Sequence, residues 1–222
     1  AKQILQNAVD KYNNSTLNSD DIDPQISDKN VLNPQNYTNI INKLDKQKLE
    51  AQKVKQANEN YNNELATVLS DSDFVGYDGA KAKYEAQVQK AKDDLAAAIK
   101  AANLDPAKLV EAYNNAKAAL ELAKENVAKN KAIDDFNKKV DELNKVKDEL
   151  SKATNSKAYS NLIFNINQNI NTEKENADFA NDFASASESQ IRTAIAKLGQ
   201  VKDEILTNQI GIDKAINLYN NP

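Results

Sequence analysis

The residues whose spacing comes closest to that of a ligand site are the acidic ones in Asp71-Ser72-Asp73-Phe74-Val75-Gly76. Two aspartates at alternate positions ahead of a glycine begin the pattern by which a helix–loop–helix loop holds Ca²⁺. Such a loop also needs an oxygen ligand at its fifth position and a bidentate Glu at its twelfth, where this chain has Val75 and Ala82. We therefore expect a capped turn here, and a solvated loop at the second acidic cluster in residues 20–23.

The chain contains no His and no Cys, and this restricts the chemistry that it can perform. Without Cys it can form no disulfide, thiolate nucleophile or Cys-ligated zinc site, and without His it lacks the commonest general base. Its 33 acidic residues are interspersed with lysines, so no carboxylate pair stands out as that of a glycoside hydrolase. Its four glycines match no phosphate-binding loop. We expect no enzyme and no catalytic, cofactor-binding or metal-binding residues; a hydrolase that uses carboxylates alone is the enzymatic alternative.

Aromatic side chains are the remaining candidates for function, because Tyr often anchors protein interfaces. Tyr12, Tyr77 and Tyr219 lie outside the most regular apolar stripes or near the ends of segments. Two roles fit them, an interface anchor or a side chain that fills the end of a helical bundle. We favour the second role.

The element around which the other segments are organised is a long helix over residues 105–153. Asp105 is suited to cap its first amides and Pro106 to occupy its first helical position, and no later Gly or Pro interrupts it. At 1.5 Å per residue this helix would be about 70 Å long. Apolar or small residues recur along it at alternating intervals of four and three, as in a helix that packs along its length against others. They are Leu109, Tyr113, Ala116, Leu120, Ala123 and Val127.

The spacing of this stripe changes at Asn130. Asn130, Ile133 and Phe136 follow one another at intervals of three, so the stripe shifts around the helix. We expect the long helix to have different packing partners before and after this point. Similar stripes predict further helices over residues 4–12, 37–68, 84–102, 159–180 and 191–219.

Local signals predict where these helices begin and end. Residues 70–79 are expected to form a turn, with Gly76 and Gly79 as helix breakers. Ser187, followed three residues later by Gln190, fits a capping box at the start of the last helix. Residues 13–34 are rich in Asn, Asp and Ser and predict a long loop or arm.

These patterns predict an all-α fold, an elongated antiparallel helical bundle or coiled coil. The helix before the long one is about half as long and can cover only its first half, while the two helices after it can cover the second. We predict two three-helix bundles that share the long central helix, a plan similar to spectrin repeats. The predicted domains are a short helix and polar arm (1–34), a first bundle (35–130) and a second bundle (131–222).

Charge and hydropathy limit the partners. The net charge is −4, whereas a nucleic-acid-binding protein needs a basic patch. No apolar run reaches the ~20 residues that cross a bilayer, and no signal peptide or anchor motif is recognised. We expect neither a nucleic-acid partner nor a transmembrane segment.

The alanine-rich segment over residues 80–131 includes AKDDLAAA (91–98) and AKAALELAK (116–124). It resembles the helical stalks of Gram-positive surface proteins, such as surface-exclusion proteins and antigen I/II-type adhesins. The resemblance implies an extracellular location, on the bacterial cell surface or secreted. We expect a spacer or adhesin that binds a protein or glycan macromolecule of a host or of the cell wall, with self-association as a further option. The alternative is an intracellular or phage coiled-coil scaffold that binds a partner helix.

Overall fold

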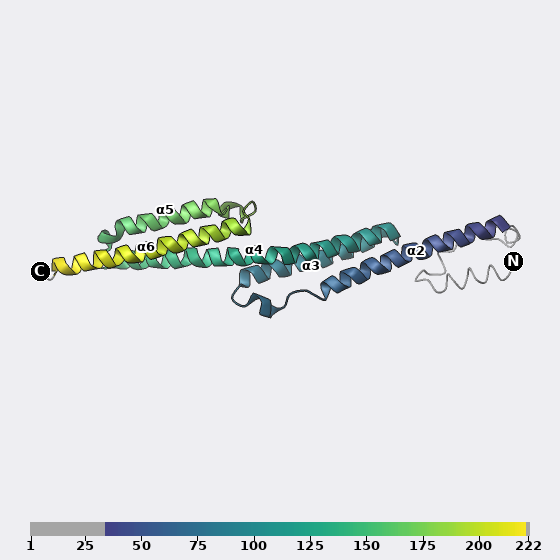
Figure 1. Ribbon diagram of the computed structural model, residues 1–222, viewed down its shortest axis with the longest axis horizontal. Helices are drawn as coiled ribbons and strands as arrows, with labels where there is room; N and C mark the ends of the chain where they lie inside the picture. Colours follow the sequence, from purple (N-terminus) through teal and green to yellow (C-terminus); the bar gives the residue numbers. More distant parts are fainter. Residues whose placement is uncertain (1–33, 221–222) are drawn as a thin grey trace. The chain divides into compact units, whose positions relative to one another are not determined.

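The computed structural model describes residues 34–220, with side chains from residue 38 onward, and this part of the chain contains helices and turns but no strand. The all-α helical-bundle prediction is confirmed. The predicted short helix and arm over residues 1–34 lie outside the described residues, apart from Pro34. In chain order the elements are α2 (Pro34–Leu65), the 3₁₀ turn η2 (Asp71–Phe74), α3 (Asp78–Ala102), α4 (Pro106–Lys152), η3 (Ser156–Tyr159), α5 (Ser160–Asn176), η4 (Phe179–Asn181) and α6 (Glu188–Asn220) (Figure 1).

The described chain divides into two compact units, and α3 and α4 contribute to both. One unit contains residues 34–68 and 87–122, and the other contains residues 69–86 and 123–220. The change from one unit to the other along α4 therefore falls before the change in stripe spacing at Asn130. The domain boundaries predicted from the sequence stay predictions.

The long helix forms as predicted, because its first amides are capped and its stripe is buried. Helix α4 has 47 residues and is about 70 Å long. The Asp105 carboxylate accepts hydrogen bonds from the amides of Ala107 at 2.9 Å and Lys108 at 3.3 Å, and Pro106 is the first helical residue. Most of the predicted stripe is buried on both sides of the change in spacing, at Ala116, Leu120, Ala123, Val127, Asn130, Ile133, Phe136, Val140, Leu143 and Leu150.

The first unit is held together mainly by small side chains. Its buried residues are Ala51, Ala57, Tyr61, Val88, Ala91, Leu95, Ala102, Ala112, Ala116 and Leu120. The rings of Tyr61 and Tyr113 lie 6.2 Å apart between centroids. Along α2 the predicted stripe is only partly buried, because Ile40, Leu44 and Val54 remain half-exposed. Helix α2 also ends at Leu65, so the predicted extension to residue 68 is wrong.

The connection between α3 and α4 is a three-residue turn with unusual backbone geometry. Asn103 and Leu104 both have positive φ, 46° and 66°, and the Leu104 side chain is exposed. Left-handed geometry is uncommon for Leu because its Cβ crowds the following carbonyl. This turn is short enough to make α3 and α4 consecutive antiparallel helices, as the sequence predicted.

The second unit has one apolar core formed by the later part of α4 with α5 and α6. The buried core residues include Phe136, Leu143 and Leu150 of α4, Leu162, Ile166 and Ile170 of α5, and Ile191, Ala194, Leu198 and Ile205 of α6. Helices α5 and α6 lie side by side (Figure 1). In the same unit the rings of Phe74 and Tyr84 are in contact, with their centroids 5.3 Å apart.

Helix α5 is shorter than the stripe predicted, because the chain turns sharply after Asn176. Asp178 has left-handed backbone geometry, and its carboxylate accepts hydrogen bonds from the amide and hydroxyl of Ser185 and from the Asn181 side chain. These bonds, the Ser185 hydroxyl first, lower the pKa of Asp178. The prediction of one helix through residue 180 is therefore wrong.

Helix α6 begins with the predicted capping box and continues through both of its glycines. The Gln190 side chain accepts a hydrogen bond from the Ser187 amide at 2.8 Å, and the Ser187 hydroxyl accepts one from the Gln190 amide at 3.2 Å. Gly199 and Gly211 lie inside the helix, as the sequence indicated. Beyond Ile205 no residue of α6 is fully buried, and its apolar residues Ile212 and Ile216 are only partly buried against the core.

Candidate functional site

The acidic loop is a capped turn, as the favoured interpretation of the sequence held. The Asp73 carboxylate accepts hydrogen bonds from the Ser70 amide at 2.8 Å and the Ser70 hydroxyl at 3.0 Å, and these bonds lower the pKa of Asp73. Asp71 pairs with the Lys81 ammonium at 3.1 Å. Among residues 34–220 no group of three or more acidic side chains is arranged to hold a metal ion. The loop carboxylates thus bind the protein's own groups.

Tyr77 is fixed in place by two lysines of α4 and does not act as a free anchor. The ammonium groups of Lys131 and Lys138 lie 5.2 Å and 4.5 Å from the centre of its ring. The same two ammonium groups donate hydrogen bonds to the carbonyls of Asp73, at 2.6 Å, and Gly76, at 2.5 Å. Cation–π contacts and bonds to turn carbonyls together hold this loop against α4. The contact is structural.

The first turn of α3 is capped by a side chain of α4. The Asp134 carboxylate accepts a hydrogen bond from the Ala80 amide at 2.9 Å. It lies so close to Gly79 that a Cβ at that position would be 2.3 Å from its Oδ1. The prediction that Gly79 breaks a helix is wrong, because this glycine lies within α3 and its missing side chain makes room for the cap. Gly76, with φ of 79°, is the true breaker.

Of the two tyrosine candidates within the described residues, Tyr219 is the one that is available to a partner. Tyr12 lies outside the described residues. Tyr219 is 87 % exposed, so the interpretation that it fills the end of a bundle is wrong for this residue. The reason is that α6 continues past the helices that cover its apolar face.

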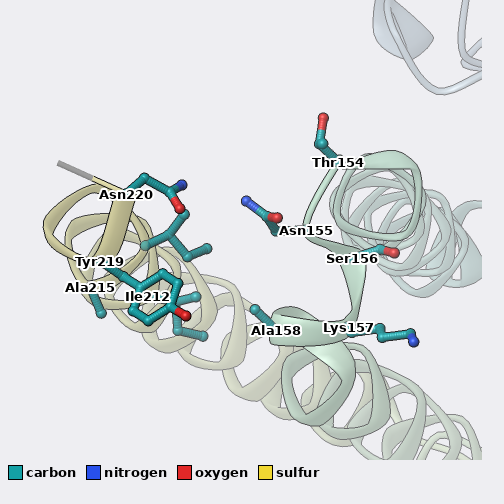
Figure 2. Close-up of a pocket in the computed structure, with 10 residues that line it drawn as sticks. Thr154, Asn155, Ser156, Lys157, Ala158, Ile212, Ala215, Tyr219 and Asn220 are labelled. Atoms are coloured by element: carbon teal, nitrogen blue, oxygen red, sulfur yellow. The ribbon is translucent and has the colours of Figure 1, made fainter.

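Tyr219 lies on the rim of an open groove of about 640 Å³ at this end of the second unit. One wall is the end of α6, and the other is the connection from α4 to α5. Figure 2 shows Tyr219, Ala215 and Ile212 on the first wall, facing Asn155 and Ala158 on the second. Lys157 and Thr154 point away from the gap. The wall along α6 is therefore mostly apolar, with the Asn220 amide at its end, and the opposite wall carries the Asn155 amide.

A partly buried hydrogen bond fixes the two walls relative to each other. The Tyr159 hydroxyl donates to the Asp213 carboxylate, and this bond raises the pKa of Tyr159. Because Tyr159 ends η3 and Asp213 belongs to α6, the bond joins the two segments that form the groove. A groove with fixed walls and apolar lining suits an apolar or aromatic side chain of a macromolecular partner.

Tyr219 could be identified as a candidate from the sequence, but the residues opposite it could not. Nothing about Asn155 or Ala158 distinguishes them locally from other polar or small loop residues. Asp213 lies directly after the stripe residue Ile212. Its partner Tyr159 is 54 residues away, so the pairing could not be identified from spacing.

A second hollow, of about 390 Å³ between α4 and α6, is lined by charged side chains that already pair with one another. The Glu142 carboxylate accepts hydrogen bonds from Lys139 and Lys202, both at 2.8 Å. These bonds, the one from Lys139 first, lower the pKa of Glu142 to about 2. Arg192 is held by Glu188 at 2.6 Å. The charged side chains around this hollow form an ion-pair network that joins α4 to α6.

Comparison with known proteins identifies no relatives. No protein-family model matches the chain, and neither the curated proteins nor the solved structures contain a match. Within residues 34–220, none of the helices combines the length and the apolar character needed to cross a membrane.

Proposed function

We propose that this chain is a non-enzymatic helical module of a bacterial surface or secreted protein that acts as a spacer or adhesin. In this role it binds a macromolecule of the host or of the cell wall. The observation that carries the proposal is the open groove at the end of α6, with Tyr219 exposed on its rim. Tyrosines with exposed rings are enriched among the residues that dominate interface energies.

The extracellular location is supported by the alanine-rich segment over residues 80–131, which resembles the stalks of Gram-positive surface proteins. The many exposed lysine–carboxylate pairs on the helices are consistent with a solvated module. Examples are Lys90 with Asp94 and Lys117 with Glu121. Pairs of this kind keep helix surfaces soluble and contribute little to stability.

A second candidate function is that of an intracellular or phage scaffold that binds a partner helix. The half-exposed stripe of α2 favours it, because Ile40, Leu44 and Val54 recur at helical spacing without full burial. A helix from another protein, or from a second copy of this chain, would bury this stripe by knobs-into-holes packing.

The test uses the full chain, immobilised and exposed to purified Gram-positive cell wall and to a set of host extracellular glycoproteins. Saturable binding to either is expected, and Tyr219→Ser should weaken it at least about tenfold. Leu122→Ser serves as the control, because Leu122 is also exposed but lies in the first unit. Fractionation of the source cells with an antibody to the chain would then locate it.

Two results would reject the proposal. The first is an exclusively cytoplasmic location, which would favour the scaffold. The second is equal loss of binding in the Tyr219 and Leu122 variants, which would mean that the groove is not the binding surface.

A further inference from the structure

Helix α5 carries the longest stretch of this chain without a charged residue. Between Lys157 and Glu173 the sequence is AYSNLIFNINQNINT, although charged residues make up 28 % of the chain. The other long helices carry lysines and carboxylates throughout their exposed faces. The stretch 158–172 is therefore an exception to the surface chemistry of the molecule.

The inner face of α5 is an ordinary core face. Leu162, Ile166 and Ile170 are buried against α4 and α6. The outer face is neutral and contains an aromatic ring. Phe164 is 60 % exposed, and it points away from the core that its neighbours fill.

Four exposed carboxamides surround Phe164 on this face. Residues three, four or seven positions apart lie on the same side of a helix, and this places Asn161, Asn167, Gln168 and Asn171 around the ring. From the first to the last of them the face extends about 15 Å along the helix axis at 1.5 Å per residue.

These carboxamides form no hydrogen bond within the described chain, whereas some carboxamides on other helices bond to one another. On α2, Gln56 donates to Asn60 at 3.0 Å and Asn62 donates to Asn58 at 3.1 Å. On the outer face of α5, no such bond is formed by the four side chains around Phe164 in the part of the chain that the structure describes. Each therefore offers two N–H donors and a carbonyl acceptor to a ligand.

We propose that the outer face of α5 centred on Phe164 binds a neutral polysaccharide. This inference rests on the proposed function, that the chain binds a macromolecule, and adds to the groove at Tyr219 a second surface with a stated class of ligand. The apolar C–H face of a sugar ring stacks on the Phe164 ring, whose face carries partial negative charge. Neighbouring hydroxyl groups then exchange hydrogen bonds with the carboxamides, which can donate and accept at the same site.

The absence of charge selects this ligand over others. A polyanion such as nucleic acid or a sulfated glycan requires lysines or arginines, and the stretch has none. A lipid surface requires a broad apolar face with basic residues at its edge, whereas Phe164 is a single ring among amides. A neutral polyhydroxylated chain matches both the aromatic ring and the unpaired amides.

The test is calorimetric titration of the full chain with neutral oligosaccharides from two sources, compared with a heparin oligosaccharide. A high-mannose oligosaccharide represents a host glycan, and a neutral rhamnan represents a bacterial wall polysaccharide. We expect at least one neutral ligand to bind more tightly than heparin. Phe164→Ala should weaken that binding about tenfold, the factor expected for one lost stacking contact.

Two further variants complete the design. Gln168→Glu adds a charge to the face with almost no change in shape and should also weaken binding. Val75→Ala is the control, because Val75 is also an exposed apolar residue of the same unit and its loss should not affect binding. Helical circular dichroism of each variant verifies that it is folded.

Three results would overturn this inference. They are tighter binding of heparin, unchanged affinity of Phe164→Ala for the neutral ligand, and sedimentation that finds the unaltered chain to be a dimer and Phe164→Ala a monomer. Binding of a host or wall macromolecule that needs Tyr219 but not Phe164 would overturn this inference alone. If neither the oligosaccharides nor those macromolecules bind, both this inference and the proposed function fail.

Discussion

Replacing glycine by alanine inside a helix usually stabilises a protein, and at Gly79 we expect the opposite. In helix interiors the exchange contributes about 0.5–1 kcal/mol, because Ala loses less backbone entropy on folding. At Gly79 the new Cβ would lie 2.3 Å from Oδ1 and 3.1 Å from Cγ of Asp134. The Asp134 side chain must then rotate away, and the Ala80 amide loses its acceptor at 2.9 Å.

The magnitude follows from two opposing contributions. Loss of a helix cap costs about 0.5–2 kcal/mol, and loss of a carboxylate beside the positive end of the helix adds about 0.3–1 kcal/mol. The gain from Ala is smaller than usual, because Gly79 lies in the first turn of α3, where the helix is weakest. We therefore expect Gly79→Ala to destabilise the protein by about 1 kcal/mol, which lowers the melting temperature by about 4 °C.

The assay is urea unfolding followed by circular dichroism at 222 nm, together with hydrogen exchange of the Ala80 amide. Gly199→Ala is the matched control, because a Cβ there meets no atom within 4 Å, and it should stabilise the protein. In an Asp134→Ala background the clash is absent, so Gly79→Ala should become neutral or stabilising, with a coupling energy of about 1–2 kcal/mol. Additive effects in this cycle, or stabilisation by Gly79→Ala alone, would refute the reasoning.

Four further outcomes are expected. Gly211→Ala should raise the free energy of unfolding by about 0.5 kcal/mol, because a Cβ there also meets open space, and a loss of stability in urea would contradict this. Asn130→Leu should stabilise the protein by about 1 kcal/mol, because the buried Asn130 amide nitrogen has no hydrogen-bond partner. A lower melting temperature for this variant would contradict the expectation. The pKa of Glu142 is lowered to about 2, so its ion pairs stabilise the fold above pH 4.5 and lose this effect as pH falls towards 2. Glu142→Gln should therefore make the free energy of unfolding depend less on pH in acid titrations. The change should be small, because the carboxylate is partly exposed. Asp213→Asn should lower the pKa of Tyr159 towards 10 in an ultraviolet titration, and an unchanged pKa would mean that this carboxylate is not the cause.

Much of the fold could be predicted because its signals are local. The alternating spacing of four and three along α4 requires only that one face of a helix be covered, whichever segments cover it. Most of that stripe is buried as predicted. The caps at Asp105 and Ser187 are equally local, since each side chain bonds to amides two or three residues away.

The predictions were wrong where the burial or the length of a helix depends on how far the segments packed against it extend. The stripe of α2 is as regular as that of α4, but periodicity cannot tell how much of it a partner covers. The length of α5 was overestimated for a related reason. Its apolar spacing continues past Asn176, while the left-handed geometry at Asp178 and the bonds to Ser185 end the helix.

The candidate groove could be predicted only in part. Exposure of Tyr219 depends on how far the segments packed against α6 extend along it, and local residue patterns do not show this. The neutral stretch of α5, in contrast, was present in the sequence. Its importance emerged only once burial of Leu162, Ile166 and Ile170 placed Phe164 on the outside.

The sequence by itself determined that this protein is all-α, that one helix runs from Pro106 to Lys152, and which face of that helix is buried. Only the tertiary structure decided that Gly79 makes room for Asp134, that Tyr159 reaches Asp213, and that Tyr219 and Phe164 are exposed. The physical reason is range. Helix formation and capping depend on neighbours within one turn, whereas these contacts depend on residues more than fifty positions apart, which packing alone brings together.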